Sequence, residues 1–303
     1  MIFARGLLVC LLLLGCEARR AATPDWVRSA PATAVAATSF RADWALQQPR
    51  LRRLLERIPI AERALDLFLM RARINFAQET GRLTVYQLGP GPGPGFLLQL
   101  GGFRDPAGLQ VALANGFPAD SAQAVNPDRP VFVILDAPPH HIRALADGEG
   151  RVWLGDLADL GSATGPAPEA LAAASDWLSP AATIQGFIRI REWPAEQPGQ
   201  AAENLARSLP RGIEALAWAV RPGLKEDAPN SFELALAGSG AGVQHGAPWL
   251  QRFLATVSAI PGSSSQAPDI LQEKARIGVR CLLTQEQIDV AMGRLGQSPL
   301  PCH

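Results

Sequence analysis

The sequence lacks several features that would direct it to a particular class of function. Only two of its 28 basic residues are lysines, tyrosine occurs once, and the formal net charge is zero. Without a net positive field there is no general attraction for a phosphate backbone, so nucleic acid is not an expected partner. The apolar run at the amino terminus ends at Glu17, short of the roughly twenty residues that a membrane-spanning helix needs.

Motifs of catalysis and cofactor binding are also missing. The chain has no Gly-x-Ser-x-Gly elbow, no His-Glu-x-x-His pair and no Cys-x-x-Cys. His140 and His141 are adjacent, and in an extended segment they point to opposite faces, so one metal ion does not readily take both. The glycine-rich run 238–242 lacks the lysine and serine that end a P-loop. We expect no metal or cofactor and assign no catalytic residue.

The amino terminus has the pattern of an export signal. Arg5 precedes an apolar core of roughly ten residues, and a small residue stands before Cys16. The ending Leu13-Leu14-Gly15-Cys16 resembles the lipobox of bacterial lipoproteins, although that family prefers Ala, Ser or Thr at the position of Leu14. The resemblance implies that residues 1–15 are removed and that the Cys16 thiol is diacylated. An ordinary secretory signal and a short apolar anchor are the alternatives.

A lipid on Cys16 would also determine where the protein works. Two or three acyl chains, at about 0.8 kcal/mol per buried methylene, hold a protein firmly on a bilayer. Among lipoproteins of Gram-negative bacteria an aspartate after the cysteine often signals retention in the inner membrane, and this chain has Glu17 there. The resemblance therefore implies attachment to the outer membrane, facing the periplasm, with residues 16–30 as a lipidated tether. In a Gram-positive cell the same motif would place the protein on the outer face of the single membrane.

Two further cysteines, Cys281 and Cys302, remain in the exported chain. An even pair in an oxidising compartment predicts a disulfide bond. Closing a loop of about twenty residues contributes roughly 3 kcal/mol in the chain-entropy model. The alternative is one buried thiol and one loose thiol.

The hydrophobic pattern predicts an α+β protein with two similar lobes, at residues 31–165 and 181–303, joined by a linker at 166–180 with one short helix. Each lobe has the order β-α-β-β-α-β, which resembles a ferredoxin-like or split βαβ unit and suggests an internal duplication. Two unrelated α+β lobes are the alternative. We expect strands at 33–42, 83–88, 96–103, 130–135, 142–146, 151–156, 182–191, 213–220, 232–237 and 275–283, and helices after Pro49 with a break at Pro59, after Pro106, and at 200–209, 248–260 and 285–295.

An arginine-rich helix is the best candidate for an interaction surface. Arg50, Arg53, Arg57 and Arg63 lie on or beside its expected turns, where basic residues outnumber acidic ones. Such a face suits lipid phosphates, an anionic polymer or an acidic envelope protein. A merely solvated face has the same pattern. The tryptophans are dispersed, and they suit either stacking on sugars or ordinary core packing.

The body of the chain resembles no characterised family. We therefore expect a lipid-anchored, non-catalytic binding or structural component of the cell envelope. A hydrolase acting on envelope material and a carrier of a small apolar ligand between the lobes are the alternatives. A hydrolase requires a cleft where an acid, a histidine and a serine converge, and a carrier requires an enclosed apolar pocket.

Overall fold

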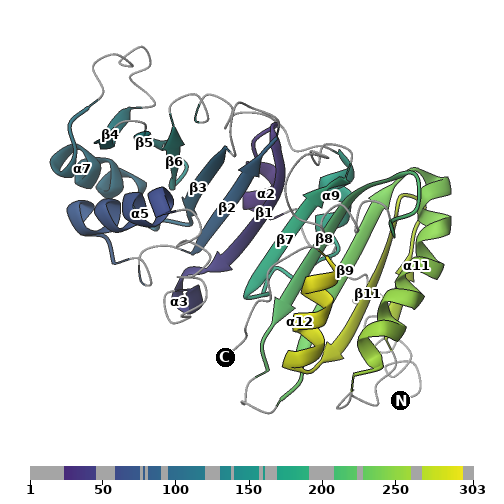
Figure 1. Cartoon of the computed structure of the whole chain (residues 1–303). Coiled ribbons are helices and arrows are strands. Elements are labelled where there is room, and N and C mark those ends of the chain that lie inside the picture. Colours follow the sequence, from purple (N-terminus) through teal and green to yellow (C-terminus); the bar gives the residue numbers. More distant parts are fainter. Residues whose placement is uncertain are drawn as a thin grey trace, which may run out of the picture.

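A computed structural model shows one continuous antiparallel sheet of 11 strands with helices on both faces (Figure 1). The structure describes residues 24–45, 59–75, 78, 81–89, 95–119, 130–137, 140–156, 160, 169–190, 208–223, 228–260 and 268–295. The export signal, Cys16 and residues 200–207 of the helix expected at 200–209 lie outside this part of the chain. No helix among the described residues is long and apolar enough to cross a membrane.

The strand order is β10-β11-β9-β8-β7-β1-β2-β3-β6-β5-β4. The central pair is β1 and β7, so the two halves of the chain share one sheet. The strands are β1 (Ala34–Arg41), β2 (Arg82–Leu88), β3 (Phe96–Gly101), β4 (Val131–Ala137), β5 (His140–Ala146), β6 (Arg151–Asp156), β7 (Ile184–Arg189), β8 (Ile213–Arg221), β9 (Asn230–Gly238), β10 (Asp269–Gln272) and β11 (Arg276–Leu283).

Helices cover the two faces of the sheet unequally (Figure 1). The longer helices share one hydrophobic core with one face, and the short helices α2 and α9 lie on the opposite face. The helix α3 (Ala42–Ala45) directly follows β1. The other helices are α2 (Asp25–Arg28), α5 (Pro59–Ala72), α7 (Pro106–Gly116), α9 (Glu169–Ser175), α11 (Gly240–Ser258) and α12 (Gln285–Arg294).

The alternation of side-chain size along β8 explains this difference between the faces. Leu216, Trp218 and Val220 enter the core with α11, whereas alanines at 215, 217 and 219 face α9. Successive residues of a strand point to opposite faces, so large side chains cover one face and alanines cover the other. A short helix can therefore pack close to the backbone on the alanine face.

Most of the expected elements are confirmed. The α+β class holds, and the expected strands in the described residues correspond to β1–β9 and β11. Asp105 caps α7 as predicted, because its side chain accepts a hydrogen bond from the Gly108 N–H at 2.9 Å. The helix after Pro59 is confirmed as α5, while the segment from Pro49 to residue 58 lies outside the described residues.

Residues 24–30, which we expected to belong to a tether, are part of the folded body. Residues 24–30 fold onto the sheet through α2, where Trp26, Val27 and Ala30 are buried. These apolar side chains join the core beneath α9. Their burial stabilises a folded segment, although the polar and proline-containing composition had indicated a tether. The folded body begins by residue 24.

The helix α11 begins earlier than its sequence pattern indicated. We expected a start at Pro248, but the helix starts at Gly240, within the glycine-rich run 238–242. The hydroxyl of Ser239 accepts a hydrogen bond from the Gly242 N–H at 3.2 Å and caps the first turn. Pro248 is accommodated inside the helix.

The structure does not show the split βαβ arrangement expected for each lobe. In a split βαβ unit a strand separates two parallel strands that are joined through a helix. Here β1 and β2 are joined through α5, yet they pair directly and run antiparallel. The expected linker at 166–180 contains α9 and the residues after it, which cover the sheet.

Candidate functional site

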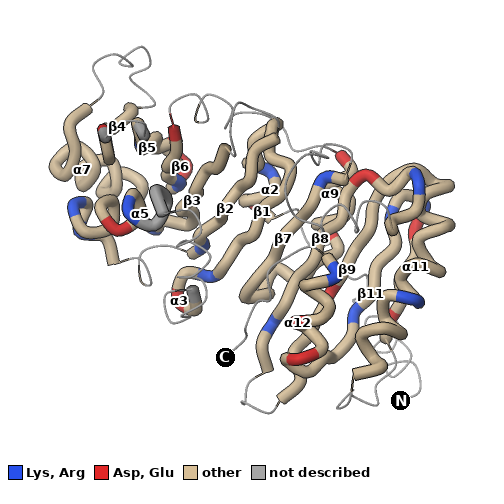
Figure 2. The backbone as a smooth tube through the Cα atoms, in the orientation of Figure 1, with Lys and Arg blue, Asp and Glu red and all other residues tan. Residues whose placement is uncertain are grey.

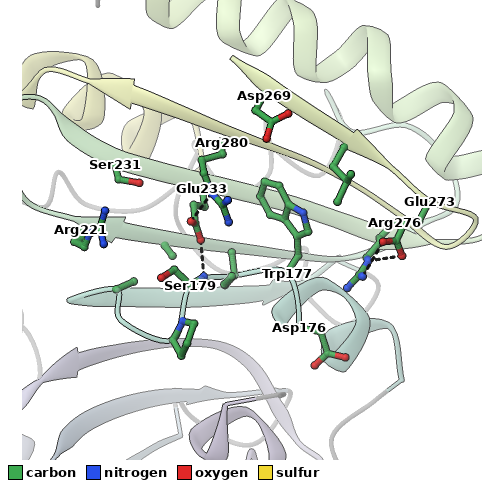
Figure 3. A pocket seen from close by; sticks show the side chains of 15 residues that line it. Asp176, Trp177, Ser179, Arg221, Ser231, Glu233, Asp269, Glu273, Arg276 and Arg280 are labelled. Atoms are coloured by element: carbon green, nitrogen blue, oxygen red, sulfur yellow. Dashed lines mark hydrogen bonds and ion pairs between the residues drawn. The ribbon is translucent and has the colours of Figure 1, made fainter. Parts of the chain in front are cut away.

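An open groove of about 650 Å³ lies on the α9 side of the sheet, in the second half of the chain (Figure 3). Residues 176–182, which follow α9, form one wall, and β8, β9, β10 and β11 form the rest. We call this the Trp177 groove. Seven of its 15 lining residues are charged: Asp176, Arg221, Glu233, Asp269, Glu273, Arg276 and Arg280.

The register of the sheet places charges of alternating sign in one row of the groove. Glu233 on β9 lies opposite Arg280 on β11, which lies opposite Asp269 on β10. Cross-strand neighbours of opposite sign stabilise a sheet. Figure 2 shows charged residues of both signs in this region of β9 and β11. The row thus carries a cation between two carboxylates.

Glu233 is the buried centre of this arrangement, since only 5% of its side chain is exposed. One carboxylate oxygen accepts a hydrogen bond from the Arg280 Nε at 2.8 Å. The other accepts one from the main-chain N–H of Ser179 at 2.6 Å. A buried carboxylate needs such partners to offset the loss of water. Glu233 therefore fixes both the floor and the wall of the groove.

Trp177 lies directly on the sheet at Gly278. A Cβ atom at position 278 would stand 3.0 Å from two atoms of the indole ring, closer than ordinary contact, so glycine lets the ring lie on the sheet without a shift. The guanidinium carbon of Arg280 is 5.3 Å from the centre of a Trp177 ring, within the range of a cation–π interaction. The indole is half-buried and still lines the groove.

A second ion pair closes the other end of the groove. Arg276 donates two hydrogen bonds to the carboxylate of Glu273, at 2.9 and 3.0 Å. The same guanidinium donates to the main-chain oxygen of Ala173 in α9 at 3.2 Å. A bidentate arginine–carboxylate pair of this kind holds the carboxylate in a defined orientation. Arg276 thus ties β11 and the turn after β10 to the end of α9.

A chain of buried hydrogen bonds connects the groove wall to α2. The indole N–H of Trp26 donates to the side-chain oxygen of Gln185 at 2.8 Å. The amide of Gln185 in turn donates to the main-chain oxygen of Ser179 at 2.7 Å. Ser179 is therefore held through its N–H by Glu233 and through its carbonyl by Gln185. The amino-terminal segment supports the wall of the groove.

Arg63, the described member of the predicted arginine-rich face, does not line this groove. Arg63 is exposed on α5, in the first half of the chain. Arg50, Arg53 and Arg57 lie outside the described residues, as does the lipid-attachment residue Cys16. Their roles stay predictions.

Cys281 lies on the side of β11 that faces the core with α11 and α12, away from the groove. Burial raises the pKa of its thiol from 9.0 to about 12. The thiol forms no disulfide with a described residue. Cys302 lies outside the described residues, so the disulfide stays a prediction.

The histidines in the described part of the chain lie outside the groove lining. His141 contacts the carboxylate of Asp136 across the β4–β5 hairpin, a partner that the sequence did not reveal. His245 contacts the Ala241 oxygen at 2.8 Å within α11. Within the described ranges no group of three His, Cys, Asp or Glu side chains is placed to hold a metal ion.

Sequence reasoning missed the groove residues, although two of them carried a signal. Glu233 interrupts an otherwise apolar buried strand, and a buried charge in such a strand needs a partner. Arg280 alternates with apolar residues of β11, which places it on the opposite face from the core. Trp177 stood among seven dispersed tryptophans, with nothing in the sequence to single it out.

Comparison with solved structures gives distant likenesses only. No protein-family model and no curated protein matches the chain. Crystal form I of TP0453 has 9% sequence identity and a TM-score of 0.38, over 86% of this chain and 94% of that chain. Crystal form III of TP0453 has 10% identity and a TM-score of 0.41, over 88% and 96% of the two chains. At these values the likeness does not extend to function.

Proposed function

We propose that the protein is a lipid-anchored, non-catalytic component of the cell envelope, and that it binds a partner at the Trp177 groove. The carrying observation is the prearranged groove, in which Glu233 holds the wall and the floor together. Export and attachment through Cys16 rest on the resemblance of residues 13–16 to a lipobox. Residence at the outer membrane, facing the periplasm, belongs to the same proposal and rests on Glu17.

The groove has the properties of a binding surface that is ready before the partner arrives. Its wall is held from both sides at Ser179, so little conformational freedom remains to be lost on binding. Trp177 and Arg280 supply the two residue types that most often dominate binding energy at protein interfaces. A partner that covered them would also exclude water from the Arg280–Glu233 pair and strengthen it.

The two alternative functions fit the groove less well. The described lining includes Ser179 and Ser231 but no histidine that could activate either hydroxyl. An apolar ligand would have to desolvate a lining in which seven of 15 residues are charged. The groove also lies within the second half of the chain, whereas the carrier hypothesis required a pocket between the lobes. We therefore favour binding of a polar partner.

We further infer that the chain consists of two similar lobes that arose by duplication. The order β1-β2-β3-β6 extends in one direction from the central pair, and β7-β8-β9-β11 extends in the other. In each half a helix, α7 or α11, follows the third strand of its series. This mirrored order supports duplication.

An arginine-rich region remains a second proposed contact site, for an anionic polymer or an envelope protein. It consists of Arg50, Arg53, Arg57 and Arg63.

Site-specific photo-crosslinking in native envelopes tests the binding function. A photoreactive residue in place of Asp176, in the groove wall, should give a discrete adduct. The same residue in place of Arg252, exposed on α11, is the matched control and should give none. The adduct should disappear when Trp177→Ala is added. Equal adducts at both positions, or an adduct unaffected by Trp177→Ala, would refute binding in the groove.

Membrane attachment is tested separately. Cys16→Ala should abolish incorporation of a labelled fatty acid and release the protein from the membrane fraction. If the variant stays membrane-bound, the lipid-anchor proposal fails. The groove proposal would survive that result.

A further inference from the structure

The outer edge of β10 borders the Trp177 groove. On its inner side β10 pairs with β11, and no strand among the described residues pairs with its outer side. All four residues of β10 are exposed, including Ile270 at 40% and Leu271 at 42%. An edge of this kind offers unpaired main-chain groups to another extended chain.

The register shows which main-chain groups the edge offers. The Glu273 N–H donates to the Arg276 carbonyl at 2.9 Å, so Glu273 points its main-chain groups toward β11. In an antiparallel pair this orientation alternates along the strand, and Leu271 and Asp269 follow Glu273. Ile270 and Gln272 therefore point their N–H and carbonyl groups outward, away from β11.

The groove-facing side chains of β10 and of the turn after it have an acidic, apolar, acidic pattern. Asp269 and Leu271 on β10 and Glu273 in the turn all line the groove, and Figure 3 shows Asp269 and Glu273 well separated along this segment. On the neighbouring strand β11, Arg280 lies opposite Asp269 and Gly278 lies opposite Leu271. Arg276 forms an ion pair with Glu273. The inner neighbour of β10 is thus basic, small and basic at alternate positions.

We propose that an extended segment of a partner polypeptide adds to the outer edge of β10, and that its groove-facing residues are basic, apolar and basic at alternate positions. The basic residues would lie beside Asp269 and Glu273, and the apolar residue beside Leu271. Main-chain hydrogen bonds to Ile270 and Gln272 provide affinity, while the alternating side chains provide specificity. This inference rests on the proposed binding function and names the chemistry of its partner.

A second copy of this chain does not fit the same edge. If two β10 strands paired antiparallel in register, Asp269 of one copy would lie opposite or diagonal to Glu273 of the other on the groove face. Like charges placed opposite each other destabilise a sheet. The acidic pattern therefore selects a basic partner and disfavours self-association.

A labelled synthetic peptide tests the inference. The probe carries the alternating segment Arg-Thr-Val-Thr-Arg between Gly-Ser flanks, and its binding to the full chain is followed by fluorescence anisotropy. We expect saturable binding that Ile270→Pro weakens by about tenfold or more, because proline removes an outward N–H. Ile270→Thr keeps that N–H and is the matched control. It should bind like the unaltered protein.

A charge exchange provides the second arm. Asp269→Lys should weaken binding of the arginine peptide and favour binding of a peptide in which one arginine is replaced by glutamate, because the remaining arginine still lies beside Glu273. The unaltered protein should bind this glutamate peptide more weakly than the arginine peptide. The charge exchange tests strand addition even if Ile270→Pro destabilises the fold and lowers its thermal midpoint.

Three results would overturn the inference: no binding of the arginine peptide, equal binding of both peptides, or binding indifferent to both substitutions. The photo-crosslink at position 176 reports on the groove independently of these peptides. If it persists while the peptides fail, the binding function stands and only the strand-addition inference falls.

Discussion

The carboxylate of Glu233 accepts a hydrogen bond from the main-chain N–H of Ser179 at 2.6 Å. These two residues are 54 positions apart in the sequence, and the bond joins β9 to the loop after α9. Because the second carboxylate oxygen binds Arg280, one buried side chain organises the groove. The stability and binding properties of the groove should therefore depend on this residue.

Glu233→Gln should destabilise the fold by about 1–3 kcal/mol. The amide can still accept from Ser179, but its NH₂ group faces the Arg280 guanidinium, so a charge-assisted bond is replaced by two opposed donors. This is less than the roughly 3–5 kcal/mol usual for a broken buried pair, because the Arg280 side chain is half-exposed. Urea unfolding followed by circular dichroism measures the change.

The matched control for this substitution is Glu149→Gln. Glu149 also pairs with an arginine, Arg151, but 71% of its side chain is exposed. Exposed pairs contribute roughly 0–1 kcal/mol. If the two substitutions cost the same, Glu233 does not have the organising role assigned to it.

Gly278→Ala should displace Trp177 from the sheet. The added methyl group would stand 3.0 Å from the ring, closer than ordinary contact, so the indole must shift. We expect a loss of about 1 kcal/mol and a red shift of tryptophan fluorescence as the ring becomes more exposed. The red shift should be absent when the same substitution is made in a Trp177→Phe background. Gly293→Ala, where nothing lies within 4 Å, is the control.

The sheet could be predicted from the sequence because its signal is local. Large and small apolar residues alternate along β8 and β9, and an alternation of period two indicates a strand without any knowledge of its neighbours. The cap of α7 was found in the same way, since Asp105 and Pro106 are adjacent. Pro248 misled the start of α11, because burial of Val243, Trp249 and Leu250 against the sheet offsets the usual cost of a proline inside a helix.

The groove could not be predicted because it depends on pairing between distant segments. Glu233 meets Arg280 only through the β9–β11 register, and Ser179 comes from a segment whose composition suggested a linker. The order of strands is likewise set by contacts across the whole chain, so the local order β-α-β-β-α-β did not distinguish a split βαβ unit from the meander observed. The packing of α2 rests on Trp26 and Val27, too short a pattern to recognise.

Trp26→Phe should weaken the support of the groove wall from α2. Phenylalanine keeps an aromatic ring beside Phe187, whose centre lies 5.8 Å from that of Trp26, but it removes the N–H that binds Gln185. Leaving the buried Gln185 oxygen without this donor should cost about 1–2 kcal/mol. Faster amide hydrogen exchange at residues 179–185 would show that the wall has loosened. A loss of stability with unchanged exchange there would contradict the connection.

The thiol of Cys281 provides a prediction about pH and a test of the predicted disulfide. Its pKa is raised by burial from 9.0 to about 12, so the folded state favours the protonated thiol more than the unfolded state does. If Cys281 is a free thiol, its contribution to stability is complete below about pH 9 and is lost progressively as the pH rises toward 12. Cys281→Ala should remove this part of the alkaline loss of stability.

If Cys281 is instead bonded to Cys302, neither thiol titrates, and the alkaline loss of stability due to Cys281 is absent. A maleimide reagent then labels the urea-unfolded chain only after reduction. Labelling of the unfolded, unreduced chain at both cysteines would therefore rule out the disulfide. In that case Cys281 should be labelled very slowly in the folded protein, because the thiolate is the reactive species and burial keeps this thiol protonated.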